Sequence, residues 1–384
     1  MKRILIFAAY FQPHVGGYER VVFELSRRLV QRGYQIDVLT CNTEKAKPYE
    51  ELNGIGIHRL PCWNALNGVY PIPKPCPTTF KILRRLLRKH YDVVNTQTRF
   101  FVTSFLGLIF AKLKKAPLVH TEHGTKHSVV PNKVVDLISR AYDHTIGTLI
   151  LKSASRNIGI SEAVCQFLKH LGAANIQLVH NGIDTTVFRR QEDTNYRQKL
   201  CLGDDAIVIT FVGRLIYAKA VQDLIAVFPR IKEAAPNARL LIVGDGPYRA
   251  TLENLAHQAA CGRDILFLGQ KNQAELVYIL SATDIFVNPS YSEGLPTSVM
   301  EAASVGVAVI ATDVGGTGEI VRNYETGMVV KAGDIGQLEQ KLRELVTNAE
   351  LRKRLGANAR MFVEQEFGWD KILRDWIEIV EGPG

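Results

Sequence analysis

The stretch from Asn288 to Glu319, NPSYSEGLPTSVMEAASVGVAVIATDVGGTGE, constrains the fold more than any other part of the chain. An apolar run with β-branched residues, Asp284 to Val287, precedes it and predicts a buried strand. Helical spacing then continues to Val305, and Val307 to Ala311 has the pattern of another buried strand. Strand, helix and strand in this order predict a right-handed β-α-β unit, and therefore an α/β fold with parallel strands.

Two carboxylates fall at one end of this unit. Glu293 lies in the loop between the predicted strand and helix, and Glu301 lies in the opening turns of the helix. Open α/β sheets bind ligands at such loops, and a helix beginning near Thr297 would direct free N–H groups towards a phosphate there. Because carboxylates repel phosphate, we expect them to bind hydroxyl groups instead. A sugar nucleotide has hydroxyl groups on both sides of its diphosphate.

A second interpretation of the same residues is purely structural. Ser298-x-x-Glu301 matches a capping box, in which the glutamate only satisfies a backbone N–H group. The spacing alone leaves both interpretations open.

The wider pattern resembles a known family. Glu293 and Glu301, in EGLPTSVMEA and followed by Gly315-Gly316-x-x-Glu319, resemble the E-x7-E and GGxxE pattern of the retaining GT-B glycosyltransferases of family 4, also called glycosyl transferases group 1. The motifs of this family follow in order along most of the chain. The resemblance implies a GT-B fold, in which two Rossmann-like β/α/β domains face each other across a cleft and a C-terminal helix crosses back to the first domain.

The length of 384 residues suits two domains of ordinary size. Val179-His180-Asn181-Gly182-Ile183-Asp184, with Phe188 beyond, resembles the family's NGxDxxxF phrase at the end of the first domain, and the polar run 189–199 predicts a linker. We therefore expect an acceptor-side domain at residues 1–190 and a nucleotide-sugar-binding domain at 191–366. Residues 367–384 are expected to form the helix that packs back on the first domain.

Paired glycines connect the first predicted strand, Ile4–Ala9, to the first predicted helix, Tyr18–Gln31. Gly16 and Gly17 would let the backbone approach a ligand closely, although a tight turn would also explain them. The resemblance implies that this loop faces the donor diphosphate.

A histidine-rich sequence, HTEHGTKH, follows the strand predicted at Pro117–Thr121. A histidine at the carboxyl end of a strand either faces a ligand or is a satisfied core residue. The resemblance places a histidine of this loop against the transferred sugar. His123 matches best, His120 is a weaker candidate, and His127 is a third.

Two cations follow the strand predicted at Ala206–Val212. Arg214 and Lys219, five residues apart, suit a diphosphate, although surface salt bridges would also account for them. GRLxxxK resembles the family's diphosphate-binding motif, except that Ala220 stands where glycine is common. The resemblance also assigns donor contacts to the GDGP turn, the loop along the base and the loop before the predicted helix: Gly244, Gly269, Gln270, Gly294, Leu295, Pro296 and Thr297.

The charge is divided unevenly. Residues 1–190 contain 27 Lys+Arg and 12 Asp+Glu, a balance of +15, and the remainder contains 20 and 26, a balance of −6, which recovers the total of +9. A basic half suits nucleic acid, anionic lipid or a phosphorylated acceptor, and the resemblance favours the last two. The basic helical sequence KILRRLLRKH, with Arg84, Arg85, Arg88 and Lys89, would suit peripheral contact with an anionic membrane, or form a solvated face.

The cysteine pattern and the apolar runs indicate a compartment. Six separated cysteines form no CxxC pair, no signal peptide is apparent, and Phe100–Ala111 is too short to span a bilayer. We expect a cytoplasmic protein, located in part at the membrane face.

The expected function is that of a retaining hexosyltransferase that moves a sugar from a nucleotide-diphosphate donor to an acceptor hydroxyl, in cell-envelope or lipid-linked saccharide synthesis. No convincing DxD pair is present, so we expect no metal and no cofactor. Arg214, Lys219, Glu293 and His123 are the expected catalytic residues, and Glu301 is expected to hold the ribose. A GT-B epimerase or phosphorylase and a non-catalytic nucleotide-sugar-binding subunit are alternatives; no nucleic-acid-reading element accompanies the basic half.

Overall fold

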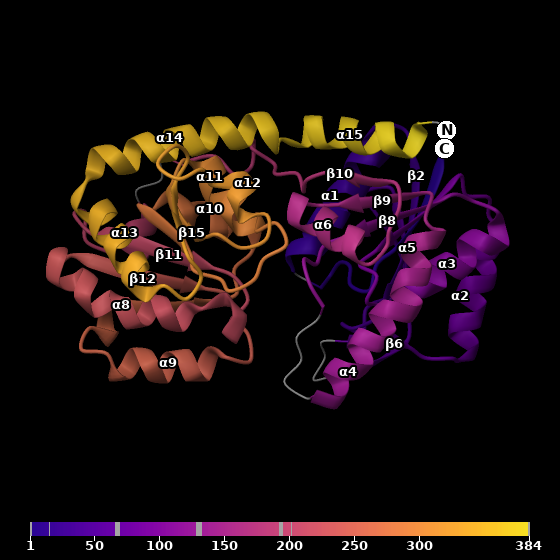
Figure 1. The fold of residues 1–384 in the computed structure, drawn as a ribbon, viewed down its shortest axis with the longest axis horizontal. Helices are drawn as coiled ribbons and strands as arrows, with labels where there is room; N and C mark the ends of the chain where they lie inside the picture. The colour runs from indigo at the N-terminus through magenta and orange to yellow at the C-terminus, as the bar shows by residue number, and fades with distance from the viewer. Residues whose placement is uncertain are drawn as a thin grey trace. The chain divides into compact units, whose positions relative to one another are not determined.

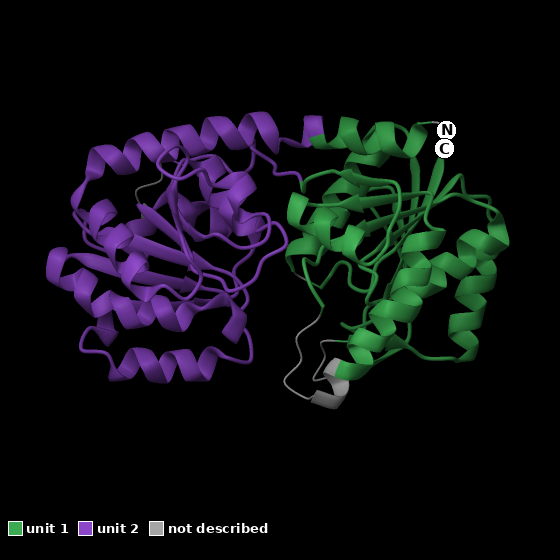
Figure 2. Cartoon of the chain, viewed as in Figure 1, with its two compact units in different colours: residues 1–181, 372–384 green, residues 182–371 purple. Residues whose placement is uncertain are grey.

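The computed structural model describes residues 2–14, 16–65, 70–127, 133–191, 195–200 and 202–382. The chain divides into two compact units (Figure 2). Unit 1 contains residues 1–181 and 372–384, and unit 2 contains residues 182–371. The domain borders expected at 190/191 and 366/367 stay predictions.

Unit 1 is built on an eight-stranded sheet in the order β10-β9-β8-β7-β1-β2-β4-β3. All neighbouring strands in it are parallel except β3, which pairs antiparallel with β4 at the edge. The strands are β1 (Arg3–Phe7), β2 (Gln35–Cys41), β3 (Tyr49–Leu52), β4 (Ile55–Leu60), β7 (Val93–Gln97), β8 (Leu118–Glu122), β9 (Arg156–Gly159) and β10 (Ile176–Leu178). The strand order reverses between β1 and β7.

Helices surround this sheet (Figure 1). They are α1 (Gly17–Gln31), α2 (Pro77–Leu87), α3 (Val102–Lys114), α4 (Lys133–Tyr142), α5 (Thr148–Ser153), α6 (Glu162–His170) and most of α15 (Trp369–Glu381), with a π-helical turn at Asp143–Gly147. One core cluster joins residues of β1, β7 and α3, including Phe7, Val94 and Phe110. The end of α15 is tied to unit 1 by a hydrogen bond of 2.5 Å from the Tyr34 hydroxyl to Glu381.

Unit 2 is built on a six-stranded sheet in the order β13-β12-β11-β14-β15-β16, and every neighbouring pair is parallel. Its strands are β11 (Ile207–Val212), β12 (Ala238–Val243), β13 (Ile265–Gly269), β14 (Ile285–Asn288), β15 (Ala308–Thr312) and β16 (Met328–Val330). Its helices are α7 (Asn195–Lys199), α8 (Val221–Ala234), α9 (Arg249–Gln258), α10 (Gln273–Ser281), α11 (Thr297–Val305), α12 (Thr317–Ile320), α13 (Ile335–Thr347) and α14 (Ala349–Glu366). The strand order reverses between β11 and β14.

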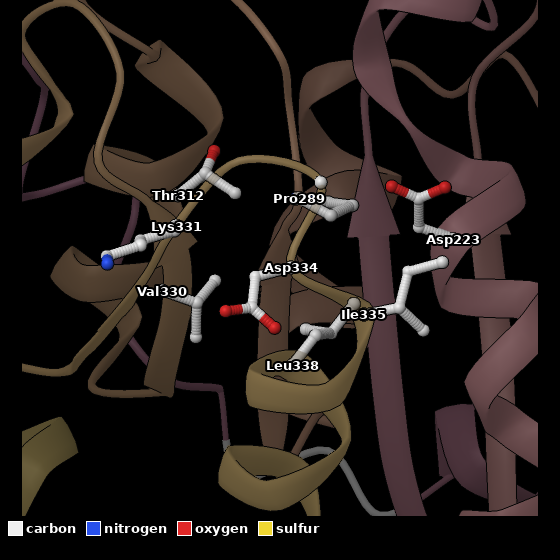
Figure 3. Close-up of a pocket in the computed structure, with 9 residues that line it drawn as sticks. Asp223, Pro289, Thr312, Val330, Lys331, Asp334, Ile335 and Leu338 are labelled. Atoms are coloured by element: carbon white, nitrogen blue, oxygen red, sulfur yellow. The ribbon is translucent and has the colours of Figure 1, made fainter.

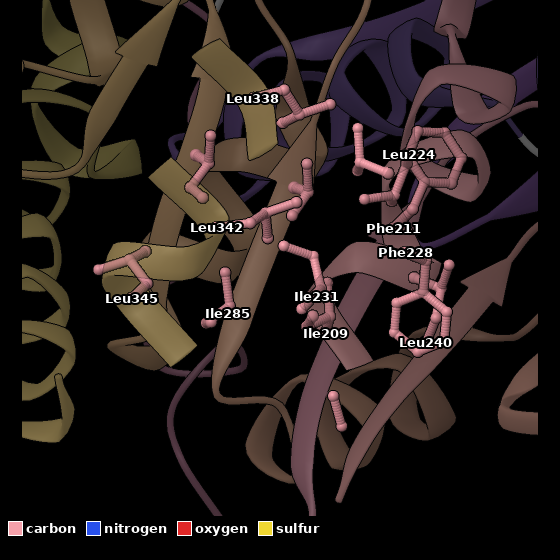
Figure 4. Packing of buried hydrophobic residues seen from close by; sticks show 14 of the residues in the cluster. Ile209, Phe211, Leu224, Phe228, Ile231, Leu240, Ile285, Leu338, Leu342 and Leu345 are labelled. Atoms are coloured by element: carbon pink, nitrogen blue, oxygen red, sulfur yellow. The ribbon is translucent and has the colours of Figure 1, made fainter. Parts of the chain in front are cut away.

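The main core of unit 2 lies between the sheet and helices α8 and α13 (Figure 4). Leu224 and Phe228 of α8 and Leu342 of α13 meet Ile209 of β11 and Ile285 of β14, and all five are fully buried. Burying each of these side chains contributes about 1.5–3 kcal/mol. On another part of the unit, α11 packs against α14 and β15. The packed sheet gives the loops at its carboxyl edge a rigid base.

Most predicted elements are confirmed, and one prediction is wrong in part. The proline-rich composition of residues 62–79 predicts an irregular loop. Instead, β5 (Cys62–Ala65) and β6 (Tyr70–Pro73) pair antiparallel there, and α2 begins at Pro77. Prolines are tolerated in β6 because, in the part of the chain that the structure describes, β6 pairs with β5 alone. In the expected linker, Gln191 N–H donates to Ser281 Oγ at 2.9 Å and α7 follows, so the described part of the segment is structured.

Candidate functional site

In unit 2, two loops adjoin at the point where the strand order reverses. The loop from Gly213 to Ala220 follows β11, and the loop from Pro289 to Pro296 follows its neighbour β14. The carboxyl edge of a parallel sheet at such a reversal is where open α/β sheets bind ligands. The two loops are connected by a hydrogen bond of 2.8 Å from Tyr291 N–H to the Ala218 carbonyl.

Lys219 and Glu293 meet between these loops. Lys219 Nζ donates to both carboxylate oxygens of Glu293, at 2.7 and 2.8 Å. Asn288 Nδ2 donates to Glu293 Oε1 at 3.3 Å, and Ser290 Oγ donates to Asn288 Oδ1 at 2.9 Å. The structure therefore brings two of the predicted site residues into direct contact and adds Asn288 behind them.

Helix α11 begins beside this pair at Thr297, as predicted. Its N-cap residue is Pro296, and no side chain caps its N-terminus. Ser298 lies inside the helix, so the alternative capping-box interpretation of Ser298 and Glu301 is wrong. Glu301 is 3% exposed, in the second turn.

Two glycines allow the loops of this site to approach closely. Gly244, with φ +130°, lies so near the Gly213 carbonyl that a Cβ would be 1.9 Å from the oxygen. A Cβ on Gly315, which has φ +57°, would likewise be 1.9 Å from the Glu293 carbonyl oxygen. Gly244 and Gly315 therefore shape the backbone around Arg214 and Glu293, a role that needs no ligand contact.

The other predicted residues of unit 2 lie on the same edge. Arg214 and Gln270 are exposed, and Leu295 is buried. Gly269, with φ +69°, accepts from Gly244 N–H at 2.9 Å, and Gly294 accepts from Gly316 N–H at 2.8 Å. Ala220 has φ +52°, which accounts for glycine being common at this position.

In unit 1, Glu122 fixes the turn that carries His123. Its Oε1 accepts from the backbone N–H groups of His123 and Gly124, both at 2.9 Å. Its Oε2 lies 2.9 Å from Arg99 Nη1. Burial alone would raise the pKa of Glu122, but the positive charge of Arg99 and the hydrogen bond from His120 hold it well below its usual range.

A chain of amides sets the hydrogen-bonding state of His123. Asn95 Nδ2 donates to the Val119 carbonyl at 3.1 Å, so its Oδ1 is free to accept from Gln97 Nε2, at 2.5 Å. Gln97 Oε1 then lies 2.7 Å from His123 Nε2. Because an amide oxygen can only accept, His123 Nε2 must carry the proton. Burial lowers the pKa of His123 to about 4, against the opposing charge of Glu122. The ring is therefore neutral, and Nδ1, buried without a hydrogen-bond partner among the described residues, is an acceptor.

The other two histidines of the loop belong to a buried ionic network. His120 is fully buried, and its Nδ1 lies 2.9 Å from Thr96 Oγ1. His127 Nδ1 lies 2.7 Å from Asp143 Oδ2, which also accepts from Arg99 at 2.9 Å. His120 is thus a satisfied core residue, whereas His127 is half-buried at the edge of the network.

Gly16 and Gly17 lie at the start of α1, as predicted, but a carboxylate lies beside them. A Cβ on Gly16 would be 2.2 Å from Glu19 Oε2, and Glu19 is 6% exposed. Glu19 Oε1 in turn lies 3.8 Å from His14 Nε2. The diphosphate contact expected of Gly16 and Gly17 stays a prediction.

A small cavity of about 10 Å³ lies elsewhere in unit 2 (Figure 3). Its lining includes Thr312 at the end of β15, Lys331 after β16 and Asp334 before α13. That volume holds about one water molecule, so the cavity is too small for a sugar nucleotide. Neither Lys219 nor Glu293 lines it.

Three general features concern the described residues only. They contain no group of three or more His, Cys, Asp or Glu side chains that could hold a metal ion. No helix in them combines the length and apolar character that crossing a bilayer requires. Their five cysteines are free thiols.

Sequence reasoning missed the residues that support the site. Gln97, Glu122 and Asn288 each occupy the last position of a strand, at the ligand-facing edge. The available signal was a polar residue at the end of an otherwise apolar strand. A buried polar group without a hydrogen-bond partner is costly, so such a residue must bond to a neighbour in the site.

Comparison with known proteins identifies the family. The pattern of Glycosyltransferase Family 4 matches residues 15–187, and that of Glycosyl transferases group 1 matches residues 192–362. An uncharacterized glycosyltransferase of Methanocaldococcus jannaschii is 30% identical over 99% of this chain and 98% of its own. A GDP-mannose-dependent monoacylated alpha-(1-6)-phosphatidylinositol monomannoside mannosyltransferase of Corynebacterium glutamicum is 27% identical over 96% and 95%.

Solved structures agree on the fold. The sucrose-phosphate synthase of Thermosynechococcus elongatus superposes with a TM-score of 0.84 at 23% identity, over 99% of this chain and 98% of its own. The predicted GT-B fold and the predicted family are confirmed, and with them the prediction of a glycosyltransferase acting on nucleotide sugars. The chain belongs to family 4 of the GT-B glycosyltransferases.

Proposed function

We propose that the protein is a retaining hexosyltransferase that works without a metal ion and transfers a sugar from a nucleotide-diphosphate donor to an acceptor hydroxyl. The observation that carries this proposal is the Lys219–Glu293 contact at the reversal point of the unit 2 sheet, beside the uncapped start of α11. It puts a group that binds phosphate next to a group that binds hydroxyls, as a sugar diphosphate requires.

The main catalytic demand is the leaving group. The nucleoside diphosphate gains negative charge as the bond to the sugar breaks, so prearranged positive groups lower the barrier. We assign this role to Arg214, Lys219 and the N-terminus of α11. Removing one such donor in other enzymes costs about 10²–10³-fold in kcat.

The hydroxyl groups of the donor require acceptors. In this proposal Glu293 accepts from a hydroxyl of the transferred sugar, and Glu301 accepts from the ribose. Neutral His123, with Nδ1 as an acceptor, is suited to a further sugar hydroxyl and unsuited to a phosphate oxygen. Gly244, Gly269 and Gln270 would line the nucleotide side.

We propose a cell-envelope or lipid-linked acceptor and peripheral contact with an anionic membrane. On α2, Lys81 and Arg84 are exposed and Phe80 is 61% exposed, and Arg88, which follows the helix, is exposed as well. Lys89 bonds to Asp37 at 2.9 Å, so it contributes to packing rather than to this face. Exposed cations around an apolar side chain suit an anionic lipid surface. The mannosyltransferase of C. glutamicum is named for a lipid acceptor, which supports the same class.

A thermal-shift screen over UDP, GDP and ADP sugars tests the donor, because a bound donor raises the melting temperature by mass action. The stabilising donor is then incubated with candidate saccharide and lipid-linked acceptors, and the anomeric configuration of the product is determined by NMR. Retention of configuration supports the proposal. An inverted product, or epimerisation of the donor without an acceptor, contradicts it.

A further inference from the structure

The Lys219–Glu293 pair joins two groups that the proposed function assigns to different parts of the donor. The Glu293 side chain is 7% exposed and that of Lys219 is 23% exposed. Because both oxygens bond to the ammonium, at 2.7 and 2.8 Å, this is a charge-assisted bidentate contact with little screening by water. As long as this contact holds, the positive charge of Lys219 is paired with the Glu293 carboxylate, and the carboxylate is paired with the ammonium.

We propose that the donor diphosphate displaces Glu293 from Lys219, and that this exchange releases the carboxylate to accept from a hydroxyl of the transferred sugar. The inference rests on the proposed function and goes beyond it, because it makes phosphate binding and sugar recognition depend on each other. Lys219 exchanges one anionic partner for another and remains paired throughout. No covalent step is involved.

Asn288 is the positioning residue of this exchange. Its Nδ2 donates to Glu293 Oε1 at 3.3 Å, and its Oδ1 accepts from Ser290 Oγ at 2.9 Å, which fixes the orientation of the amide. Asn288 and Ser290 are 1% and 0% exposed. Asn288 therefore keeps the carboxylate in place when Lys219 turns to the phosphate.

The exchange predicts that removing the carboxylate charge strengthens nucleotide binding. Binding of UDP, GDP and ADP is measured by calorimetry for the wild type and for Glu293→Gln. We expect the variant to bind the preferred nucleoside diphosphate on the order of tenfold more tightly, since Lys219 is released beforehand. Unchanged or weaker binding would overturn the exchange. Absence of binding of all three nucleotides to the wild type would instead contradict the proposed function.

A matched control removes the same charge elsewhere in unit 2. Glu350 pairs with Lys353 at 3.2 Å on the surface, where the two side chains are 86% and 76% exposed. We expect Glu350→Gln to leave nucleotide affinity within about twofold of the wild type, because exposed pairs are worth little. If Glu350→Gln gained as much nucleotide affinity as Glu293→Gln, the gain would come from net charge alone, and the inference would be overturned.

A double-mutant cycle distinguishes exchange from repulsion between the carboxylate and the phosphates. In the Lys219→Met background, exchange predicts that adding Glu293→Gln changes affinity by less than about twofold, whereas repulsion predicts an undiminished gain. An undiminished gain would overturn the proposal.

For Asn288→Ala we expect a higher KM for the donor and an unchanged Kd for the nucleoside diphosphate. Parallel loss of both would show that Asn288 acts only structurally.

Discussion

Gly315→Ala should damage the site by moving the backbone of Glu293. A Cβ at Gly315 would lie 1.9 Å from the Glu293 carbonyl oxygen, and real Cβ contacts essentially never fall below 3.0 Å, so one backbone must shift by at least 3.0 − 1.9 = 1.1 Å. A displacement of about 1 Å near reacting groups costs on the order of 10²-fold in rate. The left-handed φ of +57° adds about 1–2 kcal/mol of destabilisation.

Gly333→Ala is the matched control. Gly333 has φ +77°, and nothing lies within 4 Å of its Cβ position, so only the backbone cost applies. Urea unfolding measures stability, and release of nucleoside diphosphate from the donor selected by thermal shift measures activity. We expect both variants to lose about 1 kcal/mol or more of unfolding free energy, and only Gly315→Ala to lose activity about 100-fold. Equal activity in the two variants would refute this reasoning.

Three further predictions concern other parts of the molecule. Glu293→Ala should abolish transfer while nucleotide binding survives, and Glu301→Ala should weaken nucleotide binding itself. Calorimetry measures nucleotide binding in both variants, and its loss in Glu293→Ala would contradict the assignment. In ¹⁵N NMR spectra at neutral pH, His123 should carry its proton on Nε2, and Gln97→Leu should allow the other tautomer; a proton on Nδ1 in the wild type would contradict the amide chain. Burial alone would raise the pKa of Asp37, but hydrogen bonds from His58, Lys89 and Tyr91 lower it from 3.8 to about 2. The ionised Asp37 carboxylate contributes about 2 kcal/mol to the free energy of unfolding above the pKa of the unfolded state, and this contribution is lost as the pH falls from about 4 to 2. In Asp37→Asn the free energy of unfolding should therefore depend less on pH between these values. An unchanged pH dependence would show that the carboxylate is not paired.

Local pattern was sufficient for the fold class and for the order of the motifs. The buried strands of parallel sheets are continuous apolar runs, so β8 at Leu118–Glu122 and β11 at Ile207–Val212 lie within about one residue of their predicted bounds, and α11 begins and ends at the predicted residues. Ser161, a residue type favoured at N-caps, accepts from Val164 N–H at the start of α6, and such capping depends only on neighbours in sequence. The hairpin β5–β6 was missed because its prolines resemble loop residues and only its edge position makes them acceptable.

Patterns along the chain placed Lys219 and Glu293 each in a loop after a predicted strand, because an apolar run followed by a polar loop depends only on neighbours in sequence. Folding brings β11 and β14 side by side, so that the two residues bond to each other. Folding also lets Asn288 orient the carboxylate and Gln97 set the proton of His123. Contacts between residues 74 or 26 positions apart depend on how strands and loops pack, and a one-dimensional pattern carries no such information.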